Sequence, residues 1–392
     1  MERTQVAIIG GGPAGMLLSH MLDMSGVDSV VLERQSRAHV LGRIRAGVLE
    51  HGTVQLLRMV GLDARMEREG QRHDGTLVVW EGRPDFFIDT RGLTGKRMMA
   101  FGQTAITEEL YAARERAGGQ ILDEVEDTVI DDVLGTRPRV RYTRRGRVHE
   151  LACDFVAGCD GFHGICRQSI PARDRREFRR EYPFGWLGIL SPTPPLENIL
   201  YARHTRGFAL ASQRGSNLSR YYIQCGPDTR PEDWSDERFW DELRARLPRE
   251  LADRVATGPS LEKSMAPLRS FVSEPMRYGN LLLAGDASHI VPPTGAKGLN
   301  LAVSDVFYLH RALVEKYTRN NDVYLEGYSA TALRRVWTAE RVSWWLTMLL
   351  HEFPERDGFD DKLRENEFDH LCRSEAAQTA LAEQYVGLPY ET

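Results

Sequence analysis

The stretch that decides the fold is residues 5–33, QVAIIGGGPAGMLLSHMLDMSGVDSVVLE. Residues 5–9 form a short apolar run that is typical of a buried parallel strand. Residues 14–25 carry apolar side chains at helical spacing, and residues 28–33 predict a second strand. Together the three segments predict a βαβ unit, and therefore a protein of the α/β class.

The turn between the first strand and the helix is rich in glycine. Gly10, Gly12 and Gly15 fit the pattern G-x-G-x-x-G, in which the first glycine permits a tight turn and the third lets helix and strand pack closely. Gly12 lets backbone N–H groups approach a pyrophosphate. Glu33 ends the second strand, where it can accept a hydrogen bond from a ribose hydroxyl. The pattern predicts one dinucleotide site, for FAD or NAD, with a glycine-rich turn without ligand as the plainer alternative.

The composition narrows the function further. The chain has 392 residues, 42% hydrophobic and 27% charged, with 51 Lys and Arg against 56 Asp and Glu and a net charge of −5. These proportions exclude a disordered or fibrous protein, and the acidic balance argues against a nucleic-acid partner. Five cysteines without zinc or redox spacing predict reduced thiols and no metal site. Glycines interrupt the uncharged residues 4–22, so we expect no membrane span and a cytoplasmic protein.

Two later segments favour FAD over NAD. A strand over residues 154–158 leads into Asp160, and an apolar strand over residues 280–284 leads into Asp286. Asp286, at a strand end, can hold a polyol hydroxyl. The helix that begins near Gly298 can stabilise negative charge on an isoalloxazine ring.

These three motifs, in this order, resemble those of the FAD-dependent aromatic hydroxylases, which are single-component flavoprotein monooxygenases. Further runs extend the resemblance over essentially the whole chain, toward the members that act on 4-hydroxybenzoate: LGRIRAGVLE (41–50), PFGWLG (183–188), RGFAL (206–210), GPSLEKS (258–264), APLRSF (266–271) and YVGLPY (385–390). The resemblance implies a Rossmann-like FAD-binding domain of the glutathione-reductase type, interleaved with a β-sheet substrate domain and followed by a helical C-terminal segment. The expected boundaries are 1–72, 99–180 and 269–320 for the FAD-binding domain, 73–98 and 181–268 for the substrate domain, and 321–392 for the helical interface segment.

The resemblance also implies which residues bind the nucleotides. Those expected to bind FAD are Gly10, Gly12, Gly15, Glu33, Arg45, Gln103, Asp160, Arg220, Asp286, Gly298, Leu299 and Asn300. Those linked to NADPH, the electron donor, are Arg34, Arg43, His163 and Arg269. His39 stands where the NADPH-specific relatives carry a tyrosine, so NADH stays open as an alternative donor.

A β-hairpin centred on Asn217 is predicted to bind an anion. In that register Ser212 lies opposite Tyr222 and Arg214 opposite Arg220, with the even-numbered positions on one face. Two opposed arginines repel, which makes sense where the face meets an anion; an ordinary solvated hairpin is the alternative. The resemblance assigns Ser212, Arg214 and Tyr222 to the carboxylate of the substrate.

Aromatic hydroxyls form the last part of the expected site. Taken alone, each tyrosine is more readily a packed core residue, but the resemblance places Tyr201, Tyr385 and Pro293 at the substrate phenol. It also places His73 at the solvent end of a proton relay, and the charged neighbours of His73 suit an exposed loop. A phenol has a pKa of about 10, so forming the phenolate near pH 7 costs about 4 kcal/mol unless the site helps. A Tyr–Tyr–His chain can carry that proton out to water.

The expected function is hydroxylation of 4-hydroxybenzoate at its 3-position with NADPH and O₂, giving 3,4-dihydroxybenzoate. We expect a homodimer, and a Trp344–Trp345 helix stripe suits either core packing or a dimer contact. Two alternatives stay open. One is a related FAD hydroxylase of another benzoate, such as 3-hydroxybenzoate or 4-aminobenzoate. The other is a non-catalytic binding protein with the flavin fold.

Overall fold

The N-terminal part of the molecule is the predicted βαβ unit. The computed structural model describes residues 2–42, 47–355 and 357–391. The unit consists of β2 (Val6–Ile9), α1 (Pro13–Met24) and β3 (Ser29–Leu32). The two strands pair in parallel and every residue in them is buried, which is why the sequence reads as apolar runs there.

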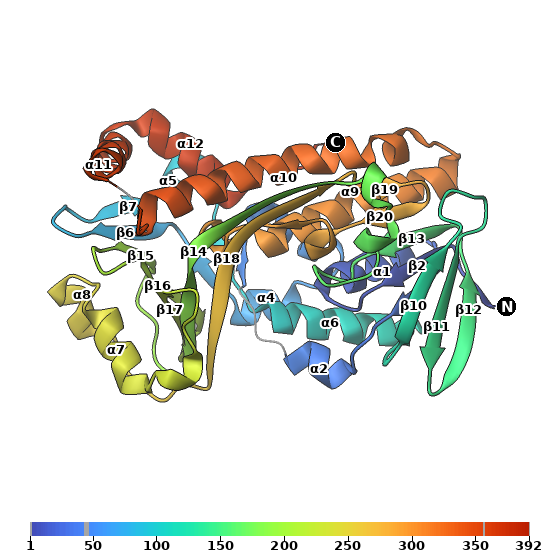
Figure 1. Cartoon of the computed structure of the whole chain (residues 1–392), viewed down its shortest axis with the longest axis horizontal. Helices are drawn as coiled ribbons and strands as arrows, with labels where there is room; N and C mark the ends of the chain where they lie inside the picture. The colour runs from blue at the N-terminus through green and yellow to red at the C-terminus, as the bar shows by residue number, and fades with distance from the viewer. Residues whose placement is uncertain (1, 43–46, 356, 392) are drawn as a thin grey trace.

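These strands belong to a sheet of order β19-β20-β13-β2-β3-β9. β13 (Phe155–Gly158) and β20 (Leu281–Leu283) run parallel to β2, so the segments that follow them meet the glycine-rich turn at one edge. The outer strands are β9 (Gln120–Leu122) and β19 (Arg277–Tyr278). α1 packs against α6 (Gln103–Arg116) and α9 (Gly298–Arg319) (Figure 1). The α/β class is therefore confirmed.

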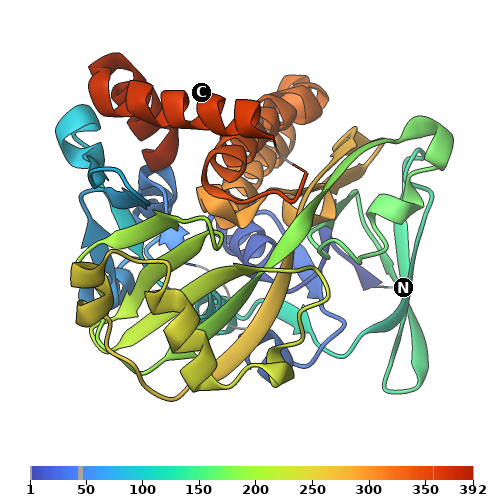
Figure 2. The ribbon, with the colours of Figure 1, turned by 60° about the vertical axis from the view of Figure 1, so that its left-hand side comes forward.

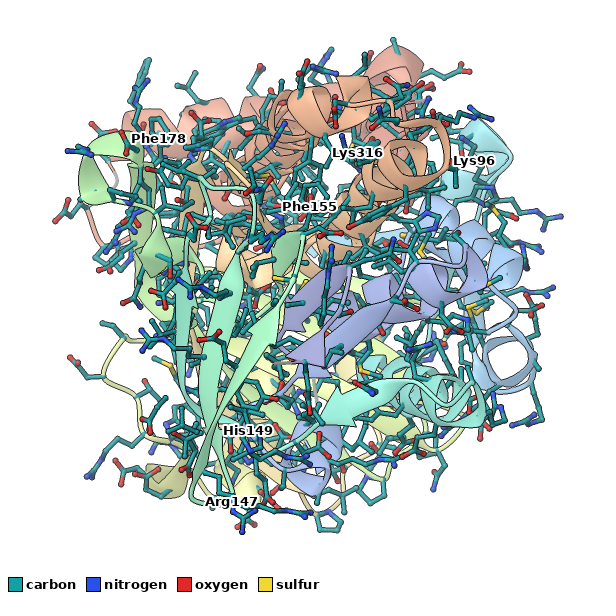
Figure 3. The ribbon with its side chains drawn as sticks, turned by 90° about the vertical axis from the view of Figure 1, so that its right-hand side faces the viewer. Lys96, Arg147, His149, Phe155, Phe178 and Lys316 are labelled. Carbon is teal, nitrogen blue, oxygen red and sulfur yellow. The ribbon has the colours of Figure 1, made fainter. Side chains whose placement is uncertain are left out.

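Two smaller sheets flank this layer. One has the order β1 (Glu2–Arg3), β12 (Arg147–Ala152), β11 (Arg139–Arg144), β10 (Glu126–Asp131), and Arg147 and His149 mark its hairpin end in Figure 3. The other has the order β4 (Val48–Leu49), β8 (Met98–Ala100), β5 (Gln71–His73). α3 (His51–Met59) follows β4. The same part of the chain also contains the short helices α2 (Arg37–Gly42), α4 (Ala64–Glu69) and α5 (Thr90–Thr94).

The largest sheet lies at the other end of the molecule (Figure 1). Its order is β21 (His289–Ile290), β18 (Glu262–Glu274), β14 (Arg176–Ser191), β17 (Leu218–Cys225), β16 (Ala209–Gly215), β15 (Ile199–Arg203), β6 (Thr76–Trp80), β7 (Phe86–Ile88). One face packs Tyr201, Leu210 and Tyr222 beneath the C-terminal helices. The opposite face packs against α7 (Asp236–Arg244) and the region of α8 (Arg249–Arg254).

A long ribbon of β14 and β18 joins the two ends of the molecule, as Figure 1 shows. The sequence did not predict the outer part of β14, because residues 176–181 are charged except for Phe178 and mostly exposed, without apolar alternation. The expected domain boundaries at 180/181 and 268/269 lie inside these two strands. The division into domains therefore stays a prediction.

The C-terminal part is helical, as the sequence predicts. α9, α10 (Val323–Leu350), α11 (Gly358–Arg373) and α12 (Glu375–Val386) follow one another, and Figure 2 shows them along the upper side of the molecule. α12 returns Tyr385 to the face of the large sheet that holds Tyr201. Among the described residues, no helix has the length and apolar character needed to span a membrane.

Candidate active site

The glycine-rich turn is shaped for a bound anion. Gly10 has φ +105°, and a Cβ there would lie 2.4 Å from the carbonyl oxygen of Cys159. A Cβ on Gly15 would lie 2.0 Å from the carbonyl oxygen of Gly10. At Gly12, by contrast, a Cβ would meet no atom within 4 Å, and α1 begins there without a side-chain cap. Open space therefore lies at the N-terminus of α1, where a pyrophosphate fits.

Two carboxylates lie beside this turn. Buried Glu33 accepts hydrogen bonds from the N–H groups of Gly11 (2.6 Å) and Gln35 (2.7 Å), so it fixes the turn while each oxygen keeps a second lone pair for a ribose hydroxyl. Asp160 accepts from the N–H of Cys166 (2.9 Å), and its other oxygen is buried without a partner among the described residues. Burial raises the pKa of Asp160.

The start of α9 supplies a second set of free N–H groups. α9 begins at Gly298 without a side-chain cap, so the N–H groups of Gly298, Leu299 and Asn300 have no acceptor within the helix. The Asn300 side chain is already used, because it bonds the backbone of Glu50, Val48 and Ala296. Only its backbone is left for a ligand. The partly exposed Asp286 lies in the turn after β20, and Gln103 begins α6.

The residues expected to bind the nicotinamide nucleotide are partly brought together. The Arg269 guanidinium carbon lies 4.1 Å from the centre of the Phe162 ring, and the His163 ring packs edge-on against the same ring at 5.0 Å. Sequence reasoning missed Phe162, which joins the two. Arg34 is exposed after β3. Arg43 and Arg45 lie outside the described residues.

The hairpin forms, but the predicted register is wrong. Ser212 lies opposite Arg220, and Leu210 opposite Tyr222, because the paired strands are centred on Ser216 and not on Asn217. A bulge between Gln213 and Gly215 then leaves Arg214 unpaired in the ladder, so the two arginines are not directly opposed. The shift is an even number of residues, which keeps the even-numbered side chains on the predicted face.

The two arginines of the hairpin differ in their partners. The guanidinium of buried Arg220 donates to Glu262 (3.0 Å) and Ser264 (2.8 Å). Arg214 donates to the carbonyl oxygen of Gln213 (2.7 Å), and its Nε is buried without a partner among the described residues. Burial, followed by the charge of Arg220, lowers the pKa of Arg214. Within the described residues, Arg214 therefore has no carboxylate partner.

Tyr201 and Tyr385, 184 positions apart, meet in the buried core of this face. The Tyr385 hydroxyl donates to the Tyr201 hydroxyl (2.7 Å), which donates to the carbonyl oxygen of Thr294 (2.8 Å). Burial is the main cause that raises the pKa of both phenols, so both are protonated at neutral pH. Pro293, which precedes Thr294, is exposed at the start of the same turn.

His73 is not in an exposed loop, which corrects the expectation from its charged neighbours. It ends β5, is only 3% exposed, and its Nε2 is buried without a partner among the described residues. Burial, with a further contribution from the Arg214 charge, lowers the pKa of His73 to about 4. The imidazole is therefore neutral at pH 7.

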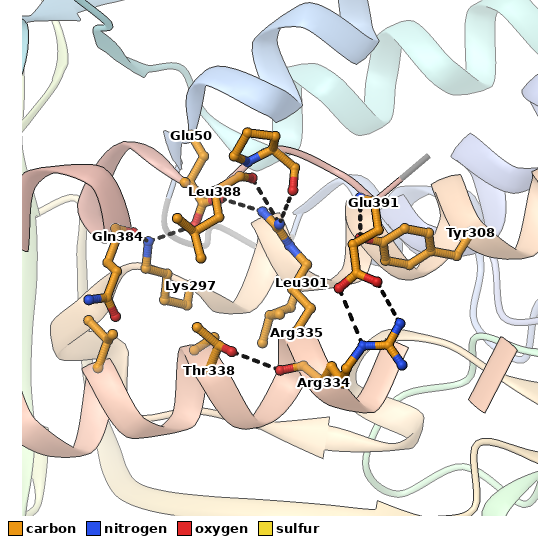
Figure 4. A pocket seen from close by; sticks show the side chains of 14 residues that line it. Glu50, Lys297, Leu301, Tyr308, Arg334, Arg335, Thr338, Gln384, Leu388 and Glu391 are labelled. Carbon is orange, nitrogen blue, oxygen red and sulfur yellow. Dashed lines mark hydrogen bonds and ion pairs between the residues drawn. The ribbon is translucent and has the colours of Figure 1, made fainter. Parts of the chain in front are cut away.

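A cavity of about 230 Å³ lies between α9, α10 and the C-terminal tail, residues 387–391 (Figure 4). Buried Lys297 donates to Glu50 (2.7 Å) and to the Tyr385 carbonyl oxygen (3.2 Å). Arg335 donates to the other oxygen of Glu50 (3.1 Å) and to the Leu388 carbonyl oxygen (2.9 Å). Sequence reasoning missed this network, although a lysine between the glycines at 295 and 298 was a usable signal.

The fold and this set of residues define a protein shaped to bind FAD. Among residues 2–42, 47–355 and 357–391, no three His, Cys, Asp or Glu side chains form a metal site. The family model described as "FAD binding domain" matches residues 3–343. The p-hydroxybenzoate hydroxylase of Acinetobacter baylyi is 49% identical over 391 residues, covering 99% of this chain and 96% of the relative. The chain belongs to this FAD-binding family and is an FAD-dependent aromatic monooxygenase.

More distant proteins share the fold. The rifampicin monooxygenase of Streptomyces venezuelae is 25% identical over 86% of this chain and 67% of its own length. Among solved structures, the p-nitrophenol 4-monooxygenase of Pseudomonas putida has a TM-score of 0.82 and 20% identity, covering 99% of this chain and 100% of that one. At that identity the likeness shows the fold alone.

Proposed function

We propose that this enzyme hydroxylates 4-hydroxybenzoate at its 3-position, with NADPH and O₂, and releases 3,4-dihydroxybenzoate. The observation that carries the proposal is the buried series Tyr385–Tyr201–Thr294 on the face that also holds Arg214. At one end of the face, the tyrosine hydroxyls can form a hydrogen bond with a phenol. At the other end, the guanidinium of Arg214 can pair with a carboxylate. The relative at 49% identity, whose name states p-hydroxybenzoate as its substrate, supports the same choice.

The hairpin would bind the carboxylate. Arg214 would give a charge-assisted hydrogen bond, and the hydroxyls of Ser212 and Tyr222 would complete the site. The Ser212 hydroxyl makes only a long bond, 3.3 Å, to the Arg220 carbonyl oxygen, so it can turn to the ligand at little cost. Holding the carboxylate there would present the phenol to Tyr201.

The tyrosines would remove the phenol proton. In the structure, the Tyr385 hydroxyl donates to the Tyr201 hydroxyl, and the Tyr201 hydroxyl donates to the Thr294 carbonyl oxygen. To accept a proton from the substrate, Tyr201 would give up its bond to the Thr294 carbonyl oxygen and donate to Tyr385 instead, so that the bond between the two tyrosines reverses. Because their pKa values are raised, the tyrosines pass the proton on rather than hold a charge. We propose that neutral His73 is the outer acceptor, reached through water.

FAD would be held by the glycine turn, Glu33, Asp160, Asp286 and the start of α9. Gln103 and Arg220 are further proposed contacts. Arg45 is proposed from the family resemblance alone. When bound, FAD supplies the redox chemistry, taking electrons from the nicotinamide nucleotide and delivering one atom of O₂ to the ring. The protein's part is to orient the ring, deprotonate it and keep water out. The carbon ortho to the phenolate oxygen is the electron-rich one, which accounts for the 3-position.

A turnover assay with product identification tests this proposal. The FAD-loaded protein is given NADPH, O₂ and, separately, 4-hydroxybenzoate, 3-hydroxybenzoate and 4-aminobenzoate. We expect 3,4-dihydroxybenzoate from the first and little hydroxylation of the others. If 4-hydroxybenzoate yields only peroxide, the substrate assignment fails.

The donor is settled by running the same assay with NADH. We propose that NADPH is held by Arg34, His163 and Arg269, and also by Arg43, which lies outside the described residues. NADH stays open as the donor because of His39, which is exposed in α2. Higher kcat/KM with NADPH supports the stated donor, and the reverse ratio transfers the role to NADH.

We also propose a cytoplasmic homodimer. Trp337 and Trp344 are 40% and 39% exposed on α10, and Phe178 packs edge-on against Trp337 at 5.2 Å. Exposed aromatic side chains in one region are typical of protein interfaces. Sedimentation velocity of the wild type and of Trp344→Arg should show a dimer and a weakened dimer, and a wild-type monomer would contradict the proposal.

A further inference from the structure

His351, the C-cap residue directly after α10, is completely buried and lies outside the proposed proton relay. Its Nε2 accepts a hydrogen bond from the indole N–H of Trp186 (2.8 Å). Its Nδ1 contacts the carbonyl oxygen of Thr347 (3.1 Å). An indole N–H can only donate and a carbonyl can only accept, so the ring is a neutral imidazole with its proton on Nδ1.

The His351 ring is also stacked within an aromatic cluster. Its ring centre lies 4.4 Å from that of Phe208 and 4.9 Å from that of Phe184, with interplanar angles of 26° and 5°. Phe208 packs edge-on against Tyr201 at 5.7 Å. Trp186, which His351 holds by its indole N–H, packs against Tyr222 at 5.1 Å. The imidazole thus connects the tyrosine at one end of the proposed pocket with the tyrosine at the other.

A second route links His351 to the phenol end. The carbonyl oxygen of Thr347 accepts the hydrogen bond from the imidazole. The hydroxyl of Thr347 also forms a hydrogen bond with the hydroxyl of Thr294 (2.9 Å). The Thr294 carbonyl oxygen is the acceptor of Tyr201. The backbone of His351 is fixed as well, because Arg364 donates to its carbonyl oxygen (2.8 Å). The ring therefore sits at a junction of β14, α10 and the turn at Pro293.

We infer that His351 is a positioning residue that sets the relation between the phenol end and the carboxylate end of the substrate pocket. This inference rests on the proposed function. A phenylalanine could stack in the same place, but it would leave the Trp186 N–H buried without an acceptor. That loss is large enough to move the indole, and Tyr222 with it.

The experiment compares His351→Phe and Trp186→Phe with Trp240→Phe. Trp240 is a matched control, since it is 5% exposed and its indole N–H donates to the Gly258 carbonyl oxygen (2.9 Å), but it packs on the opposite face of the same sheet. We expect the Kd for 4-hydroxybenzoate to rise about tenfold in His351→Phe and Trp186→Phe. The amount of product formed per NADPH oxidised should fall in the same two variants. In Trp240→Phe both should stay within about twofold of the wild type, although its stability also drops.

Nitrogen-15 NMR of the histidine side chains gives an independent readout at pH 7. The wild type should show a ring with a protonated Nδ1 and a bare Nε2 that is absent from His351→Phe, and Trp186→Phe should shift the Nε2 signal. A doubly protonated or Nε2–H ring overturns the inference. So does a Kd in Trp186→Phe equal to that in Trp240→Phe, a comparison that stands even if His351→Phe does not fold.

The outcomes separate this inference from the proposed function. A wild type that binds and converts another benzoate defeats the proposed substrate, and the same variants are then compared on that benzoate. A wild type that converts 4-hydroxybenzoate while all three variants behave alike leaves the function standing and defeats the role of His351.

Discussion

Single buried groups determine the chemistry of this site. Arg214 has no carboxylate partner in the described part of the chain, and its charge is one of the causes that hold the pKa of His73 near 4. Burial is the larger cause. Binding of a substrate carboxylate at Arg214 would offset its charge, so the substrate itself would make His73 a better proton acceptor.

Replacing Arg214 with Gln tests this coupling. Removing a nearby cation favours the protonated imidazole, so the pKa of His73 should rise from about 4 toward 6.5 without reaching it, because burial persists. Side-chain NMR over pH 3–8 measures the shift. The Kd for 4-hydroxybenzoate should also rise by tenfold or more.

Arg206 provides the control for that variant. It is exposed and paired with Glu242 at the far side of the sheet, so Arg206→Gln should change neither value. An unchanged His73 pKa in Arg214→Gln would show that the two groups are not coupled.

At the scale of elements, the glycine turn and the first helix form the proposed site of the FAD pyrophosphate. Gly12→Ala adds a methyl group where the protein has no atom within 4 Å, so the apo-protein should unfold at the same temperature. The methyl group would instead occupy the space proposed for the pyrophosphate. We expect at least a tenfold rise in the Kd for FAD, measured by fluorescence titration.

Gly358→Ala is the matched change, because that glycine also has open space around it and begins the distant helix α11. It should leave FAD binding unchanged. Equal FAD affinity in Gly12→Ala and Gly358→Ala would place the pyrophosphate elsewhere.

The elements also show what sequence patterns can and cannot predict. The βαβ unit was predictable because strand, turn and helix each leave a periodic signal. The hairpin face was predictable, but its register was not, because the bulge at Arg214 leaves no mark in the alternation of side chains. The outer part of β14 was missed because its residues are mostly charged and exposed, without apolar alternation.

At the scale of the whole molecule, long-range contacts complete the site. Tyr201 and Tyr385 could be placed together only through the family resemblance, since no local pattern spans 184 residues. The burial of His73 was hidden for the same reason, because its strand β5 contacts β16, which is distant in the sequence. The net charge of −5 likewise says nothing of the arginines that we propose to bind the anionic ligands.

The C-terminal tail is held to the body by the network around Glu50. Arg335→Met removes one of the two cations that hold this buried carboxylate, and frees the tail that follows Tyr385. Breaking such a buried pair costs about 3 kcal/mol, which should appear in the free energy of unfolding from urea titration. Cleavage of the tail by protease should also become faster.

The neighbouring Arg334 supplies the comparison. Its pair with Glu391 is exposed on both sides, so Arg334→Met should cost little. If the two variants are equally stable, the buried network does not anchor the tail.

The most direct test of the central claim is the yield of 3,4-dihydroxybenzoate per NADPH oxidised, in the wild type and in Tyr201→Phe. The variant keeps the packing but loses the hydroxyl between Tyr385 and Thr294. We predict that substrate-stimulated NADPH oxidation continues at a similar rate while the product yield falls at least tenfold and peroxide appears instead. Equal product yields in the two proteins would contradict the proposal that the buried tyrosines deprotonate the substrate.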